Sequence, residues 1–592
     1  MNNAPRFLFL IQTFAVLIAL CRIAPGNAFR QTLQAADSVA AAVQPADESS
    51  VLPTFPHAVV AADHQLASQA GIEVLKQGGN VVDAAVATAF SLSVVRPASC
   101  GLGGGGFMVI WNSQTKQAIA LDYRERAPRK AARLMYGEPW QSRVGHLAIA
   151  VPGDVAGLCF AVERYGRLEV KHVVQPAIRL AREGVLVDAY TREAQQKTLK
   201  RFSRNPHYRR QFWVLYQKYL NGGKPWEPGA RFHSPQLRVL EAIAEKGADG
   251  FYRGPVARAL LAEIRRGDGI VTQEDFDAAK PTVRKPLRTR YLGFTILAMP
   301  PPSSGGIAMI EAFNTLSAFE RTDAGQHRGA LPHNSPDYVH LLTEAMKHVF
   351  ADRATYLGDA DFVDVPVARL TSAEYAGEIA GRIAMQKTRP ATTYGRYEPV
   401  NDGGTSHLSV IDTAGNAVAC TETINTLFGS YVVEPEFGIV LNNEMDDFSA
   451  IPGRPNVFGL VQSEANAISA GKRPLSSMSP TVVLKDDRAV YALGASGGPR
   501  IISTTIQVLM NLLRFEMKPD VAINHARFHH QWLPNELLLE QPLSRSVKTS
   551  LEERGHLVRT QAGLAVSQVA SRGDRGVSGA SDPRRGGRPE GY

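Results

Sequence analysis

The sequence predicts a layered α/β fold, with strands grouped in the middle and helices packed outside them. Two kinds of pattern lead to this prediction. Short runs alternate apolar and polar residues with a period of two, as strands do, and longer runs repeat apolar residues every three to four positions, as amphipathic helices do. With 592 residues, of which 44% are hydrophobic, the chain can bury a large core.

The first two thirds of the chain are mostly helical in pattern. An early strand pair is expected at 107–111 and 117–123, joined by a short polar turn. Helices are expected at 61–76, 82–95, 153–165, 173–183, 234–246, 255–266, 307–319, 337–352 and 371–385. The polar, basic and aromatic stretch 198–229 is interpreted as a peripheral helical insertion, and 286–299 as one strand that ends in a proline- and glycine-rich turn. Thr371 is the expected cap of the last helix.

The glycine-rich stretch 101–106 satisfies the spacing G-x-G-x-x-G that dinucleotide-binding folds use. Here a predicted helix precedes the glycines and a predicted strand follows them, which reverses the strand–loop–helix order of such a site. A nucleotide site is therefore not expected. Glycine is interpreted as a requirement for close packing against a neighbouring backbone.

Strands dominate after residue 404. They are expected at 405–412, 417–423, 438–442, 480–485 and 489–493, and a helix follows at 504–515. The first two strands are joined by a short turn and form a hairpin that begins with Thr405. The preceding stretch, 386–404, has no clear pattern and ends in two glycines, which is typical of an exposed linker.

Charge and cysteine content exclude several classes of function. The formal net charge is +9, but the basic residues are scattered and form no block of like charge, so nucleic-acid binding is not expected. No cysteine and histidine spacing typical of zinc is present. Cys21 lies in an N-terminal leader; Cys100, Cys159 and Cys420 are far apart and odd in number, so they cannot all pair within one chain. No motif supports a cysteine nucleophile.

A positive charge, an apolar segment and small residues follow one another within residues 1–28, which is the pattern of an export signal with a mature start at Phe29. The protein is therefore expected to be exported, to the periplasm or outside the cell. The stretch 29–56 is expected to be a flexible lead into the folded body. Two alternatives stay open: lipidation at Cys21, and membrane anchoring through an uncleaved leader.

Thr405 is the candidate nucleophile. A threonine hydroxyl attacks poorly unless a base removes its proton, and cleavage between Gly404 and Thr405 frees an α-amine beside that hydroxyl. Such an amine has a pKa of about 7.7–8.0, close to working pH, whereas a lysine amine is near 10.4. On this stretch alone, the alternative is that Gly-Gly-Thr is a loop that enters a strand.

Longer motifs extend on both sides of Thr405. After it, they are DGGTSHLSVID (402–412), TETINTLFGS (421–430), GIVLNNEMDDFS (438–449), KRPLSSMSPTVV (472–483) and LGASGGPRIISTTIQ (493–507). Before it, they are GNVVDAAVA (79–87), GGGGFMVIW (103–111), DYRERAP (122–128), VPGDVAGL (151–158) and PPPSSGGI (300–307). In this order the pieces resemble the γ-glutamyltransferase (γ-glutamyltranspeptidase) family of N-terminal nucleophile hydrolases. The resemblance extends from about residue 57 to residue 592, and DPRRGG (582–587) resembles the C-terminal end of the family.

The resemblance implies a four-layer αββα sandwich of the N-terminal nucleophile hydrolase type, built from two autoprocessed subunits. The large subunit is 57–404 and the small catalytic subunit is 405–592, and both come from one precursor as a heterodimer. The implied activity is that of a γ-glutamyltransferase and glutathione hydrolase. Thr405 takes a γ-glutamyl group from glutathione or another γ-glutamyl amide and passes it to water or to an amino acid or peptide acceptor. This scheme requires no metal and no organic cofactor.

A γ-glutamyl substrate carries an α-carboxylate, an α-amine and a side-chain amide, so its site needs a cation, an anion and a nucleophile. Arg124 can bind a carboxylate with two parallel hydrogen bonds, and its setting in DYRERAP matches the carboxylate-binding arginine of the family. Arg126 is the alternative. The resemblance assigns the hydroxyls of Ser476 and Ser477, in PLSSM, to the same carboxylate.

Two carboxylates in NNEMDDFS, Glu444 and Asp447, lie three residues apart and can hold an ammonium group. The resemblance assigns them to the α-amine, with Asn425 in TIN as a further polar contact. Asp446 is the alternative if the register is different, and a solvated acidic turn is the alternative without function.

Three further features complete the implied site. Thr423 is expected to hydrogen-bond the nucleophile hydroxyl and to orient it. Gly497 and Gly498 fit an oxyanion hole, whose backbone N–H groups stabilise the charge that develops on the attacked carbonyl oxygen. The stretch 450–459 resembles a lid loop found in some members, with Phe458 as an aromatic gate, and such a lid excludes water.

Other hypotheses stay open. The fold also resembles that of cephalosporin (glutaryl) acylases, whose preferred substrates lack the α-amine; the presence of Glu444, Asp447 and Asn425 favours a γ-glutamyl substrate. A member that mainly hydrolyses, or that processes poly-γ-glutamate, is a second variant. From another class, an unprocessed exported binding protein could use the same pocket without turnover. One band or two on a denaturing gel separates that hypothesis from an enzyme.

Overall fold

The computed structural model describes residues 52–394, 405–460, 462–540 and 543–592, which all belong to the unit Asp47–Tyr592. The predicted leader, most of the lead that follows it, and Gly404 lie outside the described residues. Within the described part of the chain, no helix combines the length and the apolar character that crossing a membrane requires.

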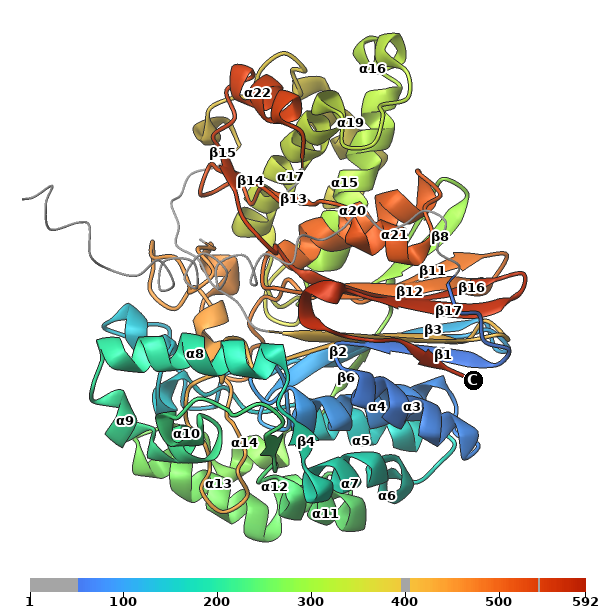
Figure 1. The fold of residues 1–592 in the computed structure, drawn as a ribbon. Coiled ribbons are helices and arrows are strands. Elements are labelled where there is room, and N and C mark those ends of the chain that lie inside the picture. Colours follow the sequence, from blue (N-terminus) through green and yellow to red (C-terminus); the bar gives the residue numbers. More distant parts are fainter. Residues whose placement is uncertain (1–51, 395–404, 461, 541–542) are drawn as a thin grey trace, which may run out of the picture. The chain divides into compact units, whose positions relative to one another are not determined.

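Two antiparallel sheets form the centre of the fold (Figure 1). The first has the order β18-β1-β9-β10-β2-β3-β6, and the second has the order β17-β16-β12-β11-β8-β7. The strands of the first sheet are β1 (Ala58–Ala62), β2 (Gly105–Asn112), β3 (Gln117–Tyr123), β6 (Thr282–Arg284), β9 (Ser406–Asp412), β10 (Ala417–Thr423) and β18 (Glu590–Gly591). Those of the second are β7 (Leu287–Tyr291), β8 (Phe294–Ala298), β11 (Thr481–Lys485), β12 (Arg488–Ser496), β16 (Val566–Gly573) and β17 (Gly576–Ser581). Both sheets therefore combine strands from before and after Thr405.

The two sheets pack face to face, because alternate side chains of each strand point into the space between them. In the first sheet, Phe107, Val109 and Trp111 of β2 face the second sheet. Met108 and Ile110 of the same strand belong instead to the core under the helices. The period of two in the sequence thus fills two separate apolar cores.

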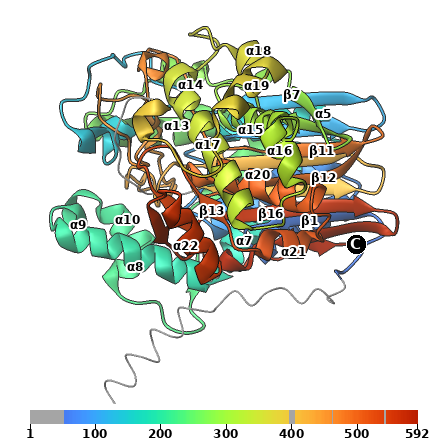
Figure 2. The same cartoon turned by 90° about the horizontal axis from the view of Figure 1, so that it is seen from above.

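Helices cover the outer face of each sheet (Figures 1 and 2). On the first sheet lie α3 (Gln65–Lys76), α4 (Val81–Val95) and α5 (Asp154–Tyr165); on the second lie α15 (Gly305–Glu320), α17 (Pro336–Tyr356), α20 (Arg500–Leu513) and α21 (Pro519–Asn524). Every side chain of α4 is buried, as its continuous apolar and alanine-rich sequence predicts. The order helix, sheet, sheet, helix is the predicted αββα sandwich.

Shorter elements surround these layers. Around the helices of the first sheet are α6 (Val170–Val173), α7 (Gln175–Glu183), α8 (Ala189–Arg204), α9 (Tyr208–Gln211), α10 (Trp213–Lys218), α11 (Leu237–Lys246), α12 (Asp249–Tyr252), α13 (Gly254–Arg266) and α14 (Gln273–Asp277), with the strand pair β4 (Val185–Leu186) and β5 (Arg231–Phe232). On the other side are α16 (Asp323–Arg328), α18 (Val367–Leu370), α19 (Ala373–Arg382) and α22 (Arg545–Glu553), with the small sheet β13 (Phe528–His529), β14 (Leu537–Leu539) and β15 (Val558–Thr560). The helical insertion predicted at 198–229 is therefore present, although it begins with α8.

One predicted element begins later than expected, and another is wrong in type. The helix predicted from residue 61 begins only at Gln65, because 58–62 pair with β9 as a strand and the side chain of His64 accepts a hydrogen bond from the Leu66 N–H. The stretch 438–442 alternates like a strand, but it forms only isolated bridges to single residues. Its neighbours there are loops, and alternation alone cannot supply a partner strand.

Two further predictions differ in detail. The single strand expected at 286–299 is a hairpin of β7 and β8, since the chain reverses at Leu292 and Gly293, which both have positive φ. Ser372, not Thr371, caps α19 by accepting the Tyr375 N–H. Strands β16 and β17 were not predicted.

The glycine-rich loop before β2 meets the predicted requirement for close packing. A Cβ on Gly103 would lie 2.1 Å from the carbonyl oxygen of Val440, and one on Gly104 would lie 2.0 Å from that of Thr423. No other residue fits at these two positions. The loop therefore brings the backbone of β10 and the segment before Glu444 close together at the edge where Thr405 lies.

Candidate active site

Thr405 directly precedes β9, at the end of a hairpin in the middle of the first sheet. In this hairpin Ser406 pairs with Glu422, so that Thr423 on β10 comes next to Thr405. The two threonine Oγ1 atoms are 3.4 Å apart, in the arrangement expected from the sequence. Arg585 Nη1 donates to the carbonyl oxygen of Thr405 at 2.8 Å and fixes its backbone from the other side. Sequence analysis did not single out Arg585, although it lies in the DPRRGG motif.

A small cavity of about 20 Å³ opens beside Thr405, and most of the predicted site residues line it. Its lining consists of Arg124, Arg353, Thr405, Thr423, Asn425, Glu444, Asp447, Phe458, Leu460, Ser476, Ser477, Met478, Gly498, Pro499 and Ile501. Residues from eight separated stretches of sequence thus converge on one small volume. Gly497 is the one predicted site residue within the described chain that is not part of this lining.

Arg124 forms a buried ion-pair cluster with both predicted ammonium ligands. Its Nη2 lies 2.5 Å from Asp447 Oδ2, and its Nη1 contacts Glu444 Oε1. The side chains of Arg124 and Glu444 are each 1% exposed. The groups predicted for opposite ends of a substrate therefore neutralise one another across the cavity.

Burial and charge together set the ionisation of this cluster. Burial raises the pKa of Glu444 and of Asp447, and the Arg124 guanidinium opposes that rise in both. Burial raises the pKa of the neighbouring Glu125 to about 7 despite the same guanidinium. For Arg124 itself burial lowers the pKa, but the carboxylates, Glu444 foremost, outweigh this and leave the pKa raised. Arg124 therefore stays charged throughout the accessible pH range.

The remaining acid of the motif, Asp446, points away from the cavity. Its carboxylate accepts hydrogen bonds from Ser142 Oγ at 2.6 Å and from the Val457 N–H at 2.6 Å, and it pairs with Arg143. Asp446 is thus hydrogen-bonded to the loop that follows it. The structure adopts the register in which Glu444 and Asp447, but not Asp446, line the cavity.

Asn425 reaches the cavity from the turn after β10. Its backbone has φ of +76°, and its N–H donates to Thr423 Oγ1 at 2.8 Å. Its side-chain amide donates to the carbonyl oxygen of Asn443 at 2.9 Å, directly before Glu444. This link ties the threonine pair to the acidic segment.

Ser476 and Ser477 also line the cavity, from the segment before β11. Ser477 Oγ accepts from Arg353 Nη2 at 3.4 Å, and the carbonyl oxygen of Ser476 accepts from Ser304 Oγ at 2.6 Å. Arg353 lies on α17 and was missed by sequence analysis. Its only signal in the sequence is a charged residue within an otherwise apolar helical face, which does not identify a site.

Gly498 lies where the second sheet ends and α20 begins. Gly497 and Gly498 have φ of +139° and +61°, which favours glycine at both positions. A Cβ on Gly498 would lie 3.0 Å from the Phe458 ring. The expected oxyanion role fits Gly498 better than Gly497, because only Gly498 faces the cavity.

The loop 450–459 covers one side of the cavity, as expected of a lid. Phe458 and Leu460 line the cavity, and Phe458 is buried. Asn456 Nδ2 donates to Asp447 Oδ1 at 3.2 Å, and Gln531 Nε2 donates to the Phe458 carbonyl oxygen at 3.2 Å. The loop is therefore hydrogen-bonded directly to one of the predicted ammonium ligands.

A larger cleft, of about 460 Å³, is also lined in part by Arg124. Arg126, Arg129 and Lys280 line it, but Thr405 and the acids do not. Size alone favours this cleft as a binding site. The convergence of nucleophile, charges and glycine instead identifies the smaller cavity as the candidate active site, and it places Arg126 outside that site.

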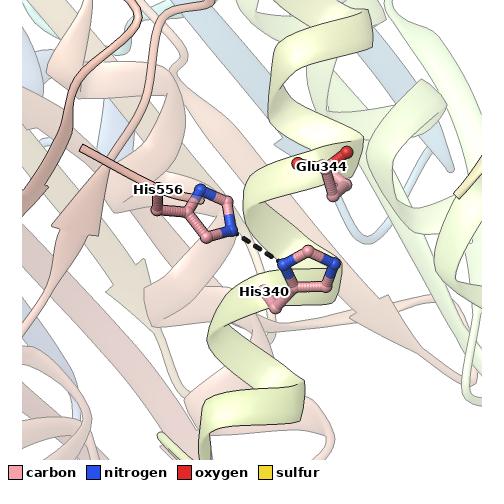
Figure 3. Close-up of side chains that lie close together, drawn as sticks. All are labelled: His340, Glu344 and His556. Carbon is pink, nitrogen blue, oxygen red and sulfur yellow. Dashed lines mark hydrogen bonds between the residues drawn. The ribbon is translucent and has the colours of Figure 1, made fainter. Parts of the chain in front are cut away.

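A separate polar cluster joins α17 to the segment between α22 and β15 and to 384–394 (Figure 3). His340 Nε2 faces the Ala384 carbonyl oxygen at 3.0 Å and must donate to it, so His340 Nδ1 accepts from His556 Nε2 at 2.7 Å. Glu344 accepts from Lys347, Thr388 and Tyr394. The ring nitrogens that face each other and the Glu344 carboxylate are the atoms that could bind a cation, and hydrogen bonds within the protein already occupy them. The cluster thus links α17 to two neighbouring segments.

Comparisons with known proteins extend over nearly the whole described chain. A family model described as Gamma-glutamyltranspeptidase matches residues 67–592. The chain is 41% identical over 538 residues to the glutathione hydrolase proenzyme of Escherichia coli (strain K12), which covers 89% of this chain and 90% of that protein. Among solved structures, a cephalosporin acylase from Bacillus halodurans has a TM-score of 0.80 at 26% identity, covering 93% of this chain and 98% of that one. A gamma-glutamyltranspeptidase from Helicobacter pylori has a TM-score of 0.51 at 34% identity, covering 59% and 96%.

Proposed function

The chain belongs to the gamma-glutamyltranspeptidase family, whose members are self-processing enzymes with a threonine nucleophile, and we propose that Thr405 is the nucleophile here. One observation carries the assignment of residues: Thr405 shares a small cavity with a buried arginine and two buried carboxylates. A nucleophile beside one cation and two anions fits a substrate whose amide carbonyl lies a short chain away from a zwitterionic end. γ-Glutamyl amides, glutathione among them, have that structure.

Self-cleavage is the first step. Thr405 Oγ attacks the carbonyl carbon of Gly404, the peptide C–N bond breaks, and the Thr405 nitrogen takes up a proton and becomes the α-amine. Water then hydrolyses the resulting ester. The products are a large subunit that ends at Gly404 and a small subunit, 405–592, which stay together as a heterodimer because both sheets contain strands of both. Thr423 orients the hydroxyl through the contact at 3.4 Å.

The freed amine then serves as the base for the second reaction. It takes the proton of Thr405 Oγ as this oxygen attacks the γ-carbonyl carbon of the donor, and the proton passes to the departing amine. The γ-glutamyl group stays on Thr405 as an ester until water, an amino acid or a dipeptide attacks it. The N–H of Gly498 stabilises the oxyanion, with Gly497 shaping its approach.

When the donor binds, its charged groups replace the ionic contacts that Arg124, Glu444 and Asp447 make with one another. The α-ammonium binds Glu444 and Asp447, with Asn425 beside them. The α-carboxylate binds on the arginine side, at Arg124 with the hydroxyls of Ser476 and Ser477. Because the donor brings one positive and one negative charge, its binding conserves the net charge of a buried site, which limits the desolvation cost.

An acylase for substrates without an α-amine is the second candidate. The TM-score of 0.80 to a cephalosporin acylase favours it, since the whole fold is shared. Glu444, Asp447 and Asn425 all reach the cavity, however, and an acyl group without an ammonium would leave both carboxylates without their partner. The γ-glutamyl donor therefore remains the first candidate.

The leader pattern at 1–28 supports export of the precursor to the periplasm or the cell exterior, with Phe29 as the first residue of the mature large subunit. Anchoring through an uncleaved leader is the minor alternative. N-terminal sequencing of the large fragment from a membrane-free extract separates the two.

Intact mass and N-terminal sequencing, run together with release of p-nitroaniline from γ-glutamyl-p-nitroanilide, test the proposal. A fragment that begins Thr-Ser-His-Leu, together with release, supports both the nucleophile and the substrate class. That fragment without release shifts the assignment to the acylase. A chain that stays uncleaved after long incubation contradicts self-processing and favours the binding-protein hypothesis.

A further inference from the structure

Helices α8, α9 and α10 carry most of the net charge of the chain. Residues 189–218, which span these three helices, contain eight basic residues and one acidic residue, Glu193. Their formal net charge is therefore +7, compared with +9 for all 592 residues. Neutral residues interrupt the basic ones, so the segment contains no long run of like charge, and the concentration of charge becomes evident only in the fold.

These helices lie at one edge of the molecule (Figures 1 and 2). Helix α8 buries Ala194 and Phe202 against the body of the protein. Lys200 and Arg204, which lie four residues apart and therefore on one side of the helix, are exposed. No residue of α9 is buried. The basic side of α8 and the whole of α9 thus face solvent.

Most of the exposed basic groups on this surface have no counter-ion. Glu193, the one acidic residue of the segment, is already paired with Lys197 at 2.7 Å. Among the described residues, Lys200, Arg204 and Arg210 form no ion pair. Ion pairs therefore leave the positive potential of this surface largely uncancelled, and such a potential attracts an anionic partner.

An exposed aromatic pair lies beside these charges. Trp213, the first residue of α10, is 51% exposed. Its ring stacks on that of Tyr216, with 6.0 Å between the centroids, and the Arg209 guanidinium lies 4.9 Å from the centroid of Tyr216. Tryptophan next to arginine and lysine is typical of segments that lie on a membrane surface, where the indole enters the headgroup region and the cations contact lipid phosphates.

We infer that the surface formed by Lys200, Arg204, Arg209, Arg210 and Trp213 binds the headgroups of anionic phospholipids and holds the protein reversibly at a membrane surface. The leader pattern at 1–28 supports export, and an exported protein meets the phosphates of lipids rather than those of nucleic acids. The inference goes beyond the proposed function and does not depend on the chemistry at Thr405. It concerns peripheral binding and requires no membrane-spanning helix.

Sedimentation of the purified protein with lipid vesicles tests the inference. One set of vesicles contains phosphatidylglycerol, which is anionic, mixed with phosphatidylcholine, and the other contains phosphatidylcholine alone. We expect the protein to sediment with the anionic vesicles only. Raising the NaCl concentration from about 0.05 M to about 0.5 M should reduce this binding at least about tenfold, because salt screens charges at a surface.

The triple variant Lys200→Gln, Arg204→Gln, Arg210→Gln removes the basic groups that have no ion pair. Each basic residue near an anionic bilayer raises the affinity about fivefold, so we expect the partition coefficient to fall about 100-fold. Trp213→Ala should lower it a few-fold without changing its dependence on salt, since the lost contact is not ionic.

A second triple variant, Arg288→Gln, Arg321→Gln, Arg545→Gln, is the matched control. These arginines are exposed, lie on or beside β7, α15 and α22, and form no ion pair among the described residues. The control loses the same charge as the first variant, but from the other side of the sandwich, and it should bind vesicles as the wild type does. An unchanged melting temperature shows that each variant is folded.

Four results would overturn the inference. The first is a wild type that does not sediment with anionic vesicles at low salt, and the second is equal sedimentation with phosphatidylcholine alone. The third is an equal loss in both triple variants, which assigns the binding to overall charge. The fourth is tighter binding of single-stranded DNA than of vesicles, abolished in the first triple variant, which assigns the surface to nucleic acids. A protein that binds anionic vesicles but releases no p-nitroaniline contradicts only the proposed function.

Discussion

Arg124 Nη2 lies 2.5 Å from Asp447 Oδ2 inside the cavity that contains Thr405. The sequence separates these residues by 323 positions, and it assigns them to opposite ends of one substrate. Their contact shows that the positive and the negative group of the site form an ion pair with each other. Substrate binding must therefore exchange ionic contacts, and selectivity depends on how well each donor replaces them.

The pair gives a first prediction, for Asp447→Asn. This change keeps the shape of the side chain but removes one of the two charges that receive the α-ammonium. We expect kcat/KM for γ-glutamyl-p-nitroanilide to fall by about 10²-fold, since loss of one partner of a buried charge pair costs about 2–5 kcal/mol. With glutaryl-p-nitroanilide, which has no α-amine, the fall should be several-fold smaller. Equal losses with both donors would argue against an ammonium contact.

Thr405→Ala should prevent maturation. Without the hydroxyl there is no attack on Gly404, so the precursor should stay a single band on a denaturing gel, near 64.3 kDa if the leader is kept. Thr405→Ser keeps a hydroxyl and should still give two bands, more slowly. Appearance of two bands in Thr405→Ala would mean that another protease makes the cut.

Phe458→Ala tests the loop over the cavity. The ring packs against Gly498 and closes one side of the site, so its removal should admit water to the γ-glutamyl ester. At a fixed concentration of a dipeptide acceptor, we expect the ratio of transfer to hydrolysis to fall a few-fold while self-cleavage is unchanged. The measurement is the amount of each product by chromatography. Val457→Ala, next to it but outside the lining, is the matched control.

The His340–His556 pair predicts sensitivity to acid. Burial lowers the pKa of both histidines, that of His556 to about 2, with Lys347 and Arg554 adding to the effect and Glu344 opposing it at His340. In the unfolded chain these histidines have a pKa of about 6.5, so below that pH only the unfolded chain takes up the protons. As the pH is lowered further, the free energy of unfolding therefore decreases by about 1.4 kcal/mol per pH unit for each histidine.

Buried carboxyls with a raised pKa, such as Glu422 at about 7, have the opposite effect on stability at acid pH, so the wild type alone does not show the contribution of the histidines. His556→Gln removes the contribution of one histidine and leaves the carboxyls unchanged. Urea unfolding of the wild type and the variant at pH 7 and pH 5 is the measurement. The variant should lose less stability on acidification than the wild type. A difference of zero between the two would show that the pair does not stay neutral in the fold.

Local patterns in the sequence predicted the elements that carry the nucleophile. Alternation over 405–412 and 417–423 gave the hairpin of β9 and β10, and the structure confirms it. The predicted buried helix at 82–95 is confirmed as well, since a run of alanine and valine has no polar face to expose. These elements depend on side chains near in sequence, which is why a single sequence can predict them.

Errors occurred where a distant partner decides the structure. Residues 58–62 become a strand because β9 offers them an edge, and 438–442 fail to become one because no strand lies beside them. The β16–β17 hairpin joins the second sheet through the pairing of β16 with β12, a strand more than 60 residues earlier in the chain. Pairing over hundreds of residues leaves little trace in a local pattern.

For this protein, sequence by itself determined the candidate nucleophile, the family motifs and the residue types that could bind a charged substrate. Tertiary structure alone decided that Arg124 pairs with Asp447 and that Arg353, from a helix of the opposite layer, is left without an ion pair among the described residues. The physical reason is that burial and charge pairing depend on which side chains meet across the sandwich. A short motif specifies the chemistry of each group, whereas only packing determines its partner.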